Sequence, residues 1–75
     1  MQGEGERILV VGAGGRLGRE MLAECRRRGY RVRALMRCPA RADRLRPYAD
    51  EIVVGDALRP ETLPPALAGV DRVFS

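Results

Sequence analysis

Four consecutive apolar residues, Ile8 to Val11, form a clear hydrophobic run near the start of the chain. Apolar residues without alternation are typical of a strand that is buried on both faces of a parallel sheet. The turn Gly12-Ala13-Gly14-Gly15 follows at once, and after it apolar residues recur at helical spacing. The pattern therefore predicts a strand over residues 7–11 that passes through the glycines directly into a helix.

The helix after the turn is predicted to bury one face. Leu17, Met21, Leu22 and Cys25 share one side at helical spacing, and Gly29 stands where a helix C-cap is expected. We expect the four apolar side chains of this side to pack on the sheet.

The remaining hydrophobic pattern predicts three more strands. Residues 30–36 alternate at first and then run apolar, which indicates a second strand with an exposed beginning. Because a strand-helix-strand unit crosses over in a right-handed sense, this strand should lie parallel to the first and beside it. Further strands are expected over residues 51–56 and 70–75. The predicted fold is an α/β, Rossmann-type parallel sheet (β-α-β-α-β-α-β, order 3-2-1-4), an incomplete doubly wound domain.

Two proline-bearing segments between these strands are predicted to form short helices. Pro39 opens the first segment and Pro47 closes it. In the second segment, residues 60–69, two adjacent prolines are tolerated only in a first helical turn. We therefore expect that helix to begin late, with Thr62 as its N-cap.

The length bounds the domain organisation. A chain of 75 residues is one domain at most, and such a chain buries only about 60% of its unfolded surface. Residues 1–6 are polar and glycine-bearing, so we expect a disordered leader there, with residues 7–75 forming the domain. Because doubly wound domains usually have about six strands, we expect this chain to be the N-terminal part of a longer one.

The glycine spacing in the first turn indicates a chemical role. A helix that begins straight after a buried strand presents free N–H groups, which suit the diphosphate of a dinucleotide. Gly12 adopts turn dihedrals closed to other residues, Gly15 lets a phosphate approach, and Gly18 lets helix and strand pack closely. Gly12, Gly15 and Gly18 complete the motif G-x-x-G-x-x-G. The motif G-x-G-x-x-x-G is also present, with Gly14 as its second glycine, whereas the commoner G-x-G-x-x-G is not, because Leu17 stands at its third glycine. A hairpin or linker is the alternative, but the flanking strand and helix favour a dinucleotide-phosphate loop.

The residue that ends the second strand indicates which cofactor is preferred. An acid there would bind the ribose 2′-hydroxyl of NAD, whereas an arginine pairs with the 2′-phosphate of NADP. The residue is Arg37, with Arg41 as a second candidate, and the nearest downstream acid is Asp43. The sequence predicts NADP(H) in preference to NAD(H); a merely solvent-facing Arg37 is the alternative.

The third predicted strand ends at Asp56, and Ala57 follows it. An aspartate at the carboxyl end of a parallel strand can accept a hydrogen bond from the adenine amino group, and the next backbone N–H can donate to the ring. The alternative is a turn aspartate that caps the following segment.

Composition narrows the classes of partner. Fourteen basic residues, all arginine, stand against ten acids and give a net charge of +4, which permits phosphate-bearing ligands. Two tyrosines and one phenylalanine provide no stacking platform, so we expect no nucleic-acid binding. Cys25, expected in the core, and Cys38, expected at the surface, lack metal-ligand spacing, which argues against a metal site and favours a reduced cytoplasmic setting. No apolar run approaches the roughly 20 residues of a membrane span.

With these motifs in place the chain resembles the N-terminal part of the atypical short-chain dehydrogenase/reductases, the NmrA-like and biliverdin reductase B-like NAD(P)-binding proteins. The resemblance is carried by residues 11–18, 32–37, 54–57 and 67–71. A departure is Gly14, which occupies a position often held by threonine or serine in that family.

The resemblance implies roles for individual residues. Backbone N–H groups of Arg16 and Leu17 would bind the diphosphate, and Arg37 would hold the 2′-phosphate. Residues 56–57 would frame the adenine, and residues at and just after Ser75 would run toward the nicotinamide ribose. Many members use a Tyr-x-x-x-Lys pair to donate a proton, but this chain contains no lysine, so no catalytic residue is assigned.

Three functions follow as hypotheses. The first is the dinucleotide-binding part of an NADPH-dependent oxidoreductase whose small-molecule substrate binds residues beyond this chain. The second is a non-catalytic NADP-sensing regulator or assembly factor on the same fold. The third, a basic nucleic-acid-binding module, would need a contiguous arginine surface. Because the crevice beside strand four is only just formed by residues 7–75, we expect weak or no cofactor binding and no turnover from these residues alone.

Overall fold

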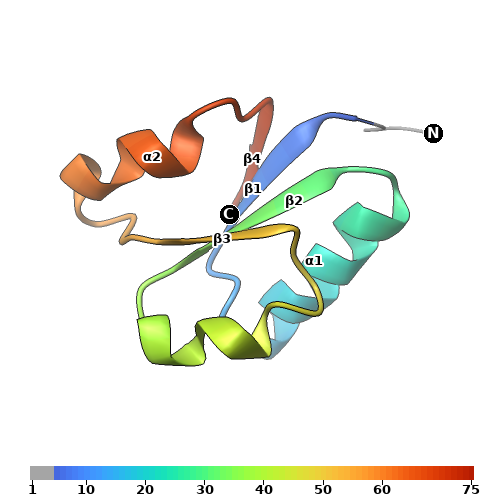
Figure 1. Cartoon of the computed structure of the whole chain (residues 1–75), viewed down its shortest axis with the longest axis horizontal. Helices are drawn as coiled ribbons and strands as arrows, with labels where there is room; N and C mark the ends of the chain where they lie inside the picture. The colour runs from blue at the N-terminus through green and yellow to red at the C-terminus, as the bar shows by residue number, and fades with distance from the viewer. Residues whose placement is uncertain (1–4) are drawn as a thin grey trace.

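Four parallel strands form one sheet in the order β3-β2-β1-β4 in the computed structural model, which describes residues 5–75 (Figure 1). The strands are β1 (Arg7–Val11), β2 (Arg31–Met36), β3 (Glu51–Val54) and β4 (Arg72–Phe74). The predicted α/β class, parallel pairing and strand order are confirmed, although β3 and β4 are shorter than the predicted ranges.

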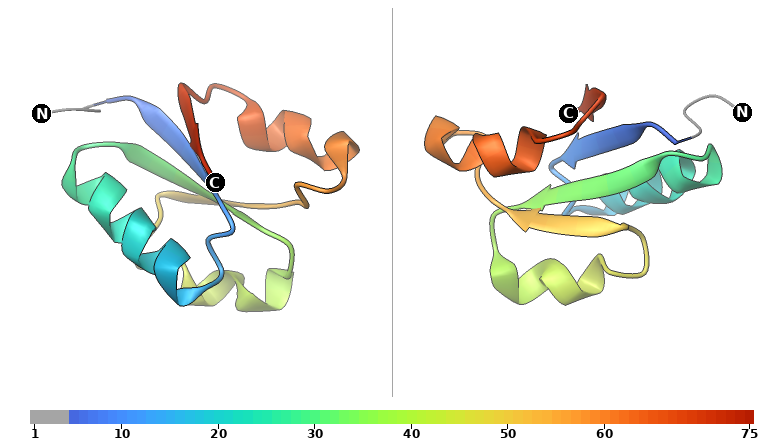
Figure 2. Two further views of the ribbon diagram at one scale, coloured as in Figure 1. Left: turned by 180° about the vertical axis from the view of Figure 1, so that it is seen from behind. Right: turned by 45° about the horizontal axis from the view of Figure 1, so that its top comes forward.

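Helix α1 (Arg16–Arg27) and the 3-10 helix η1 (Pro39–Arg44) cover one face of the sheet (Figure 2). On this face Leu22 and Cys25 of α1 pack with Ile8 and Val10 of β1, and Leu45 completes the same core. The prediction that Cys25 belongs to the core is confirmed.

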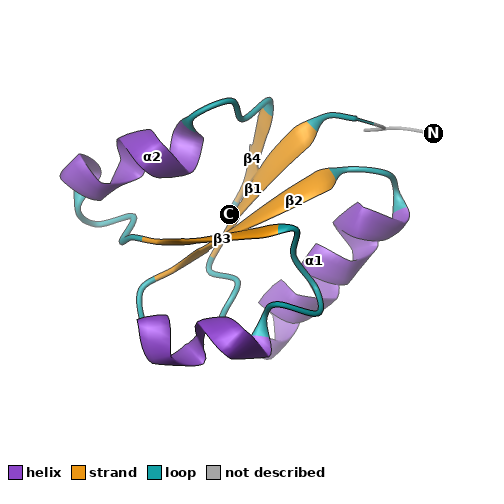
Figure 3. Cartoon of the chain, viewed as in Figure 1, coloured by secondary structure: helices purple, strands orange, loops and turns teal. Residues whose placement is uncertain are grey.

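Helix α2 (Leu63–Leu67), with the 3-10 turn η2 (Pro60–Thr62) before it, covers the opposite face (Figure 3). Leu9 of β1 and Leu35 of β2 pack there against Ala66. Successive residues of β1 therefore enter two different cores, which is why the strand is apolar without alternation.

Thr62 precedes α2 as predicted but makes no cap with its side chain. Its hydroxyl donates to the carbonyl oxygen of Arg59 at 2.7 Å and accepts from the amide of Asp56 at 2.9 Å. The side chain therefore fixes the loop after β3 and leaves the helix end uncapped.

The expected packing of Leu17 is wrong. Its side chain is 75% exposed, whereas Leu22 on the same helix is fully buried. Leu17 lies in the first turn of α1, next to the glycine turn, and among residues 5–75 it is part of neither hydrophobic core. Helical periodicity gives the direction of a side chain, but it does not give the extent of the surface beneath the helix.

The predicted exposure at the beginning of β2 is right for Arg31 and wrong for Arg33, which is only 6% exposed. The Arg33 guanidinium donates to the carbonyl oxygens of Ala66 and Ala68, each at 2.8 Å, and lies 3.4 Å from the carboxylate of Glu51. The buried charge is thus paired with the carboxyl end of α2 and with an acid of the neighbouring strand.

The predicted leader lies partly outside the described residues, which begin at Gly5. The amide of Gly5 donates to the carbonyl of Gly29 at 3.2 Å, and the Glu6 carbonyl accepts from Arg31 at 2.8 Å. Among residues 5–75, no helix has the length and apolar character required to cross a bilayer.

Candidate functional site

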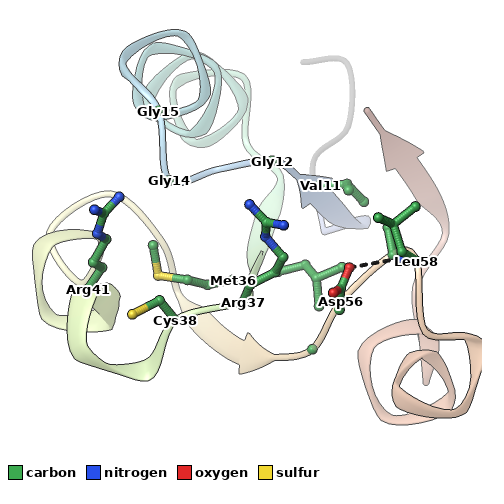
Figure 4. A pocket seen from close by; sticks show the side chains of 13 residues that line it. Val11, Gly12, Gly14, Gly15, Met36, Arg37, Cys38, Arg41, Asp56 and Leu58 are labelled. Atoms are coloured by element: carbon green, nitrogen blue, oxygen red, sulfur yellow. Dashed lines mark hydrogen bonds between the residues drawn. The ribbon is translucent and has the colours of Figure 1, made fainter.

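A pocket of about 480 Å³ opens at the carboxyl ends of β1, β2 and β3. Three segments line it: the turn between β1 and α1, the end of β2 with the residues that lead into η1, and the loop after β3 (Figure 4). Open parallel sheets characteristically bind ligands at this edge, where the strand order reverses direction. Here the reversal falls at β1, between β2 and β4.

The glycine turn leaves the first amides of α1 without protein partners. Gly15 is the N-cap residue and provides no side chain to cap the helix. The first bond into the helix runs from the amide of Arg19 to the carbonyl of Gly15 at 3.1 Å. Among residues 5–75, no acceptor is found for the amides of Arg16, Leu17 and Gly18. Such amides, together with the helix dipole, favour an anion.

The three spaced glycines differ in what they allow. Gly12 has φ +77°, in the region that L side chains rarely adopt. A Cβ on Gly18 would lie 2.6 Å from the carbonyl oxygen of Gly12 and 2.7 Å from the Cα of Ala13. A Cβ on Gly15 would meet no atom within 4 Å. Gly18 is therefore required for close packing against the turn, whereas Gly15 keeps space open in front of the helix.

Arg37 and Arg41 line the side of the pocket opposite the glycine turn. Arg37 follows β2 and Arg41 lies in η1, and Figure 4 shows both guanidinium groups extending toward the segment that carries Gly12 and Gly14. Neither arginine forms an ion pair within residues 5–75. Cys38 lies between them as an exposed free thiol, as predicted. This wall is therefore positively charged.

Asp56 lies at the edge formed by the loop after β3. Its Oδ1 accepts the amide of Leu58 at 2.9 Å, the bond drawn in Figure 4. The turn interpretation of this aspartate is thus present in the structure, and it uses one of the two carboxylate oxygens. Within the part of the chain that the structure describes, Asp56 is the one acidic side chain that lines the pocket.

Six of the predicted site residues line the pocket together: Gly12, Gly14, Gly15, Arg37, Asp56 and Ala57. The others lie outside its lining. Ala13 is buried in the core beneath α1, and Arg16, Leu17 and Gly18 form the first turn of that helix. Ser75 is exposed and follows β4.

Sequence reasoning assigned no site role to Met36, Gly55 and Leu58, which also line the pocket. Gly55 had a readable signal, since it ends a strand directly before the aspartate. A Cβ there would lie 3.0 Å from Leu35 Cδ1, so the glycine lets the loop pass close to β2.

The perturbed pKa values belong to groups outside the pocket lining. Hydrogen bonds from Arg27 and then Arg28 lower the pKa of Glu24 to about 2 at the far end of α1. Burial raises the pKa of the Cys25 thiol. These shifts describe packing and surface pairing of α1 and assign no acid or base to the pocket.

Comparisons with known proteins agree with this geometry. The profile of a family described as NAD(P)H-binding matches residues 12–75. Photosystem II assembly factor Ycf39 of Trieres chinensis is 39% identical over 67 residues, which are 89% of this chain and 21% of that protein. The NAD(P)H azoreductase of Xenophilus azovorans is 40% identical over 89% of this chain and 23% of its own length.

A solved structure shows the same arrangement. A Bacillus halodurans protein, provisionally titled an NAD-dependent epimerase/dehydratase, superposes with a TM-score of 0.82 at 35% identity. The match covers 93% of this chain and 33% of that one. This chain thus spans between about a fifth and a third of the length of these three proteins. The predicted resemblance to the atypical short-chain dehydrogenase/reductases is confirmed, and the chain belongs to the NAD(P)H-binding family.

Proposed function

We propose that this chain is the NADP(H)-binding part of an oxidoreductase that transfers a hydride to a small-molecule substrate. The observation that carries the proposal is the pairing of two opposed pocket walls. One wall is the glycine turn, which leads directly into the uncapped amides of α1, and the other carries Arg37 and Arg41 without acidic partners among residues 5–75. Such walls match the two charged parts of NADP, its diphosphate and its 2′-phosphate.

The diphosphate would bind at the glycine turn. Amides of Arg16 and Leu17 are oriented by the helix and have no acceptor within residues 5–75. The open space in front of Gly15 supports a close approach of the phosphates. Backbone donors of this kind need no side chain, so the turn can be built from glycine and alanine without loss of binding groups.

The adenosine end would lie between β2 and the loop after β3. Arg37 would pair with the 2′-phosphate, with Arg41 as its second contact. The Asp56 oxygen that does not bind Leu58 is available to accept from the adenine amino group, and the amide of Ala57 would donate to the ring. Leu58 adds apolar surface at this edge.

The nicotinamide end would lie toward Ser75. Because β4 is parallel to β1 and hydrogen-bonded to it, its carboxyl end leads to the same edge of the sheet. Bound nicotinamide supplies the hydride, and the protein contributes orientation and the acid that receives or returns a proton. Because the matched residues are 21% of the length of Ycf39 from Trieres chinensis, we expect the substrate and this acid to lie in parts of the protein outside the present sequence. Cys25 and Cys38, both free thiols, support a reducing compartment such as the cytoplasm.

A non-catalytic NADP-sensing regulator or assembly factor is the second candidate. It is favoured by the similarity to a protein named as a photosystem II assembly factor and by the lack of a Tyr-x-x-x-Lys pair in these 75 residues. Such a protein would keep the dinucleotide pocket and use its occupancy as a signal.

Calorimetric titration of the protein at its full natural length with NADPH and NADH tests the proposal. We expect NADPH to bind more tightly, and Arg37→Ala to weaken NADPH selectively. Arg31→Ala, which removes an exposed arginine at the opposite end of β2, is the matched control. Equal affinity of the wild type for both cofactors would reject the NADP assignment.

Turnover distinguishes the two candidates. The oxidoreductase should oxidise NADPH in the presence of at least one acceptor from a panel of quinones, azo compounds and carbonyls. Tight binding of NADPH without oxidation by any member of the panel would favour the regulator.

A further inference from the structure

The side chain of Thr62 holds the loop that carries Asp56, although Thr62 itself lies outside the pocket lining. The amide of Asp56 donates to the Thr62 hydroxyl at 2.9 Å, and that hydroxyl donates to the carbonyl oxygen of Arg59 at 2.7 Å. The carbonyl oxygen of Asp56 lies 3.0 Å from the same hydroxyl and accepts from the Arg59 amide at 2.8 Å. Both backbone polar groups of Asp56 are therefore fixed by residues that follow it.

Gly55 allows Thr62 to approach the loop this closely. A Cβ on Gly55 would lie 3.3 Å from Thr62 Oγ1 and 3.3 Å from the Thr62 carbonyl oxygen, and both separations are shorter than an ordinary van der Waals contact of a Cβ. The amide of Gly55 donates to the carbonyl oxygen of Met36 at 2.9 Å. The loop is thus held by the end of β2 on one side and by Thr62 on the other.

These bonds leave one acceptor and one donor of the loop without a partner. Asp56 Oδ1 accepts from the Leu58 amide at 2.9 Å, whereas Oδ2 accepts no hydrogen bond within residues 5–75 (Figure 4). The amide of Ala57 stands between two engaged amides, and in the same part of the chain it has no acceptor. Asp56 and Ala57 both line the pocket, so they present an acceptor and a donor from consecutive residues.

This pair is complementary to adenine and mismatched to hypoxanthine, the base in which an oxygen replaces the adenine amino group. Adenine offers the amino donor at N6 beside the acceptor N1, whereas hypoxanthine offers the acceptor O6 beside an N1–H donor. Opposite Asp56 Oδ2 and the Ala57 amide, hypoxanthine would set acceptor against acceptor and donor against donor. A site that hydrogen-bonds a polar group rejects an analogue that leaves its own groups unpaired. Discrimination between the bases therefore depends on how this pair is oriented.

We propose that Thr62 is a positioning residue for the adenine end of the site, and that its hydroxyl makes the protein select adenine over hypoxanthine. Thr62 acts through Asp56 and Ala57, because its bonds fix the peptide that joins them and keep the Asp56 amide from competing for Oδ2. This inference rests on the proposed function, because it requires a dinucleotide in the pocket. A threonine that served folding alone would affect all ligands of the pocket equally.

The test uses the protein at its full natural length and four variants. Thr62→Val and Thr62→Ala remove the hydroxyl in two different shapes, so the second serves if valine prevents folding, and Thr62→Ser keeps the hydroxyl. Val32→Ala is the control, because it removes packing from the core beneath α1, on the sheet face opposite α2. Calorimetry gives the dissociation constants of NADPH, NADH and their deamino analogues, in which hypoxanthine replaces adenine, and urea denaturation shows which variants are folded.

The readout is the affinity ratio of each cofactor to its deamino analogue. The wild type should bind the adenine form about 10-fold more tightly, as expected for one charge-assisted hydrogen bond. In Thr62→Val and Thr62→Ala the ratio should fall to about 2, mainly because the adenine form binds more weakly. Thr62→Ser should restore the ratio to within about twofold of the wild type, and Val32→Ala should keep it whatever its stability.

The outcomes separate this inference from the proposed function. If the wild type binds neither NADPH nor NADH, the proposed function fails and this inference fails with it. If the wild type binds a cofactor and its deamino analogue equally well, the inference alone is overturned. Folded Thr62→Val or Thr62→Ala protein that keeps the wild-type ratio would overturn it too. An equal loss of affinity for both forms would show a general structural role of Thr62 and likewise overturn the inference.

Discussion

Replacing Gly18 with alanine tests the link between the packing of α1 and the shape of the glycine turn. The new Cβ would lie 2.6 Å from the Gly12 carbonyl oxygen, and 2.7 and 2.8 Å from two backbone carbons of Ala13. Carbon atoms in contact prefer separations of about 3.5–4.0 Å, so the overlap is close to 1 Å. All three atoms belong to the backbone, so no side-chain rotation relieves the overlap.

Two effects of opposite sign decide the stability of this variant. Alanine in place of glycine in a helix favours folding by about 0.5–1 kcal/mol. Overpacking of a well-packed site typically costs about 1–3 kcal/mol. Because rigid backbone resists here, the upper part of that range applies, and we expect a net destabilisation of about 1–2 kcal/mol.

Gly15→Ala is the matched control, since its Cβ would meet no atom within 4 Å and the residue has a φ of −89°. Its free energy of unfolding should stay within about 1 kcal/mol of the wild type. Alanine is a poorer N-cap residue than glycine, but it also lowers the conformational entropy of the unfolded chain, and the two effects oppose each other. The same methyl group would occupy the space proposed for the diphosphate, so NADPH affinity should fall.

Urea denaturation followed by far-ultraviolet circular dichroism gives the stabilities, and calorimetry gives the affinities. We expect Gly18→Ala to lower the free energy of unfolding. We expect Gly15→Ala to weaken NADPH binding while the free energy of unfolding stays nearly that of the wild type. A Gly18→Ala protein as stable as the wild type would refute the packing argument. Unchanged NADPH affinity in Gly15→Ala would refute the location of the diphosphate.

Three further predictions concern individual side chains. Cys38 is exposed in the pocket wall, so it should react rapidly with a thiol reagent, and bound NADPH should protect it. Cys25 is buried, and burial raises the pKa of its thiol, so it should react slowly. Labelling of Cys38 at the same rate with and without NADPH would contradict the location of the site. Arg33→Met leaves the carbonyls at the end of α2 unpaired, so it should destabilise the fold by about 2–4 kcal/mol. A thermal unfolding midpoint within roughly 2–3 °C of the wild type would argue against a stabilising role of Arg33. Hydrogen bonds from Arg27 lower the pKa of Glu24 from 4.5 to about 2, so its small contribution to folding stability should be present above pH 4.5 and lost toward pH 2. An NMR titration that places the pKa of Glu24 near 4.5 would contradict these hydrogen bonds.

The sheet was predictable because its signals are local. The unbroken run of β1 reports burial on two faces, and its predicted bounds, residues 7–11, agree with the strand observed. The strand order followed from the right-handed crossover rule together with the order typical of doubly wound folds. The positive φ of Gly12 was equally predictable, since a chain that turns straight from strand to helix needs such a residue.

Burial at particular positions was not predictable where it depends on distant elements. Arg33 is buried because the carboxyl end of α2, more than thirty residues later, provides acceptors for its guanidinium. Leu17 is exposed although it shares the apolar side of α1, because the two hydrophobic cores do not reach the first turn of that helix. The small hollow lined by Arg19 of α1 and Arg41 and Arg44 of η1 likewise depends on how these two elements face each other, which no periodicity in the sequence specifies.

The central claim is that bare amides at the start of α1 hold the diphosphate of a dinucleotide. The most direct test is a ¹H–¹⁵N NMR titration of the full-length protein with NADPH, with the backbone amides assigned. We predict that the amide resonances of Arg16, Leu17 and Gly18 shift most strongly and saturate together with binding. Saturable NADPH binding that leaves these three resonances in place, with the largest shifts elsewhere in the chain, would contradict it.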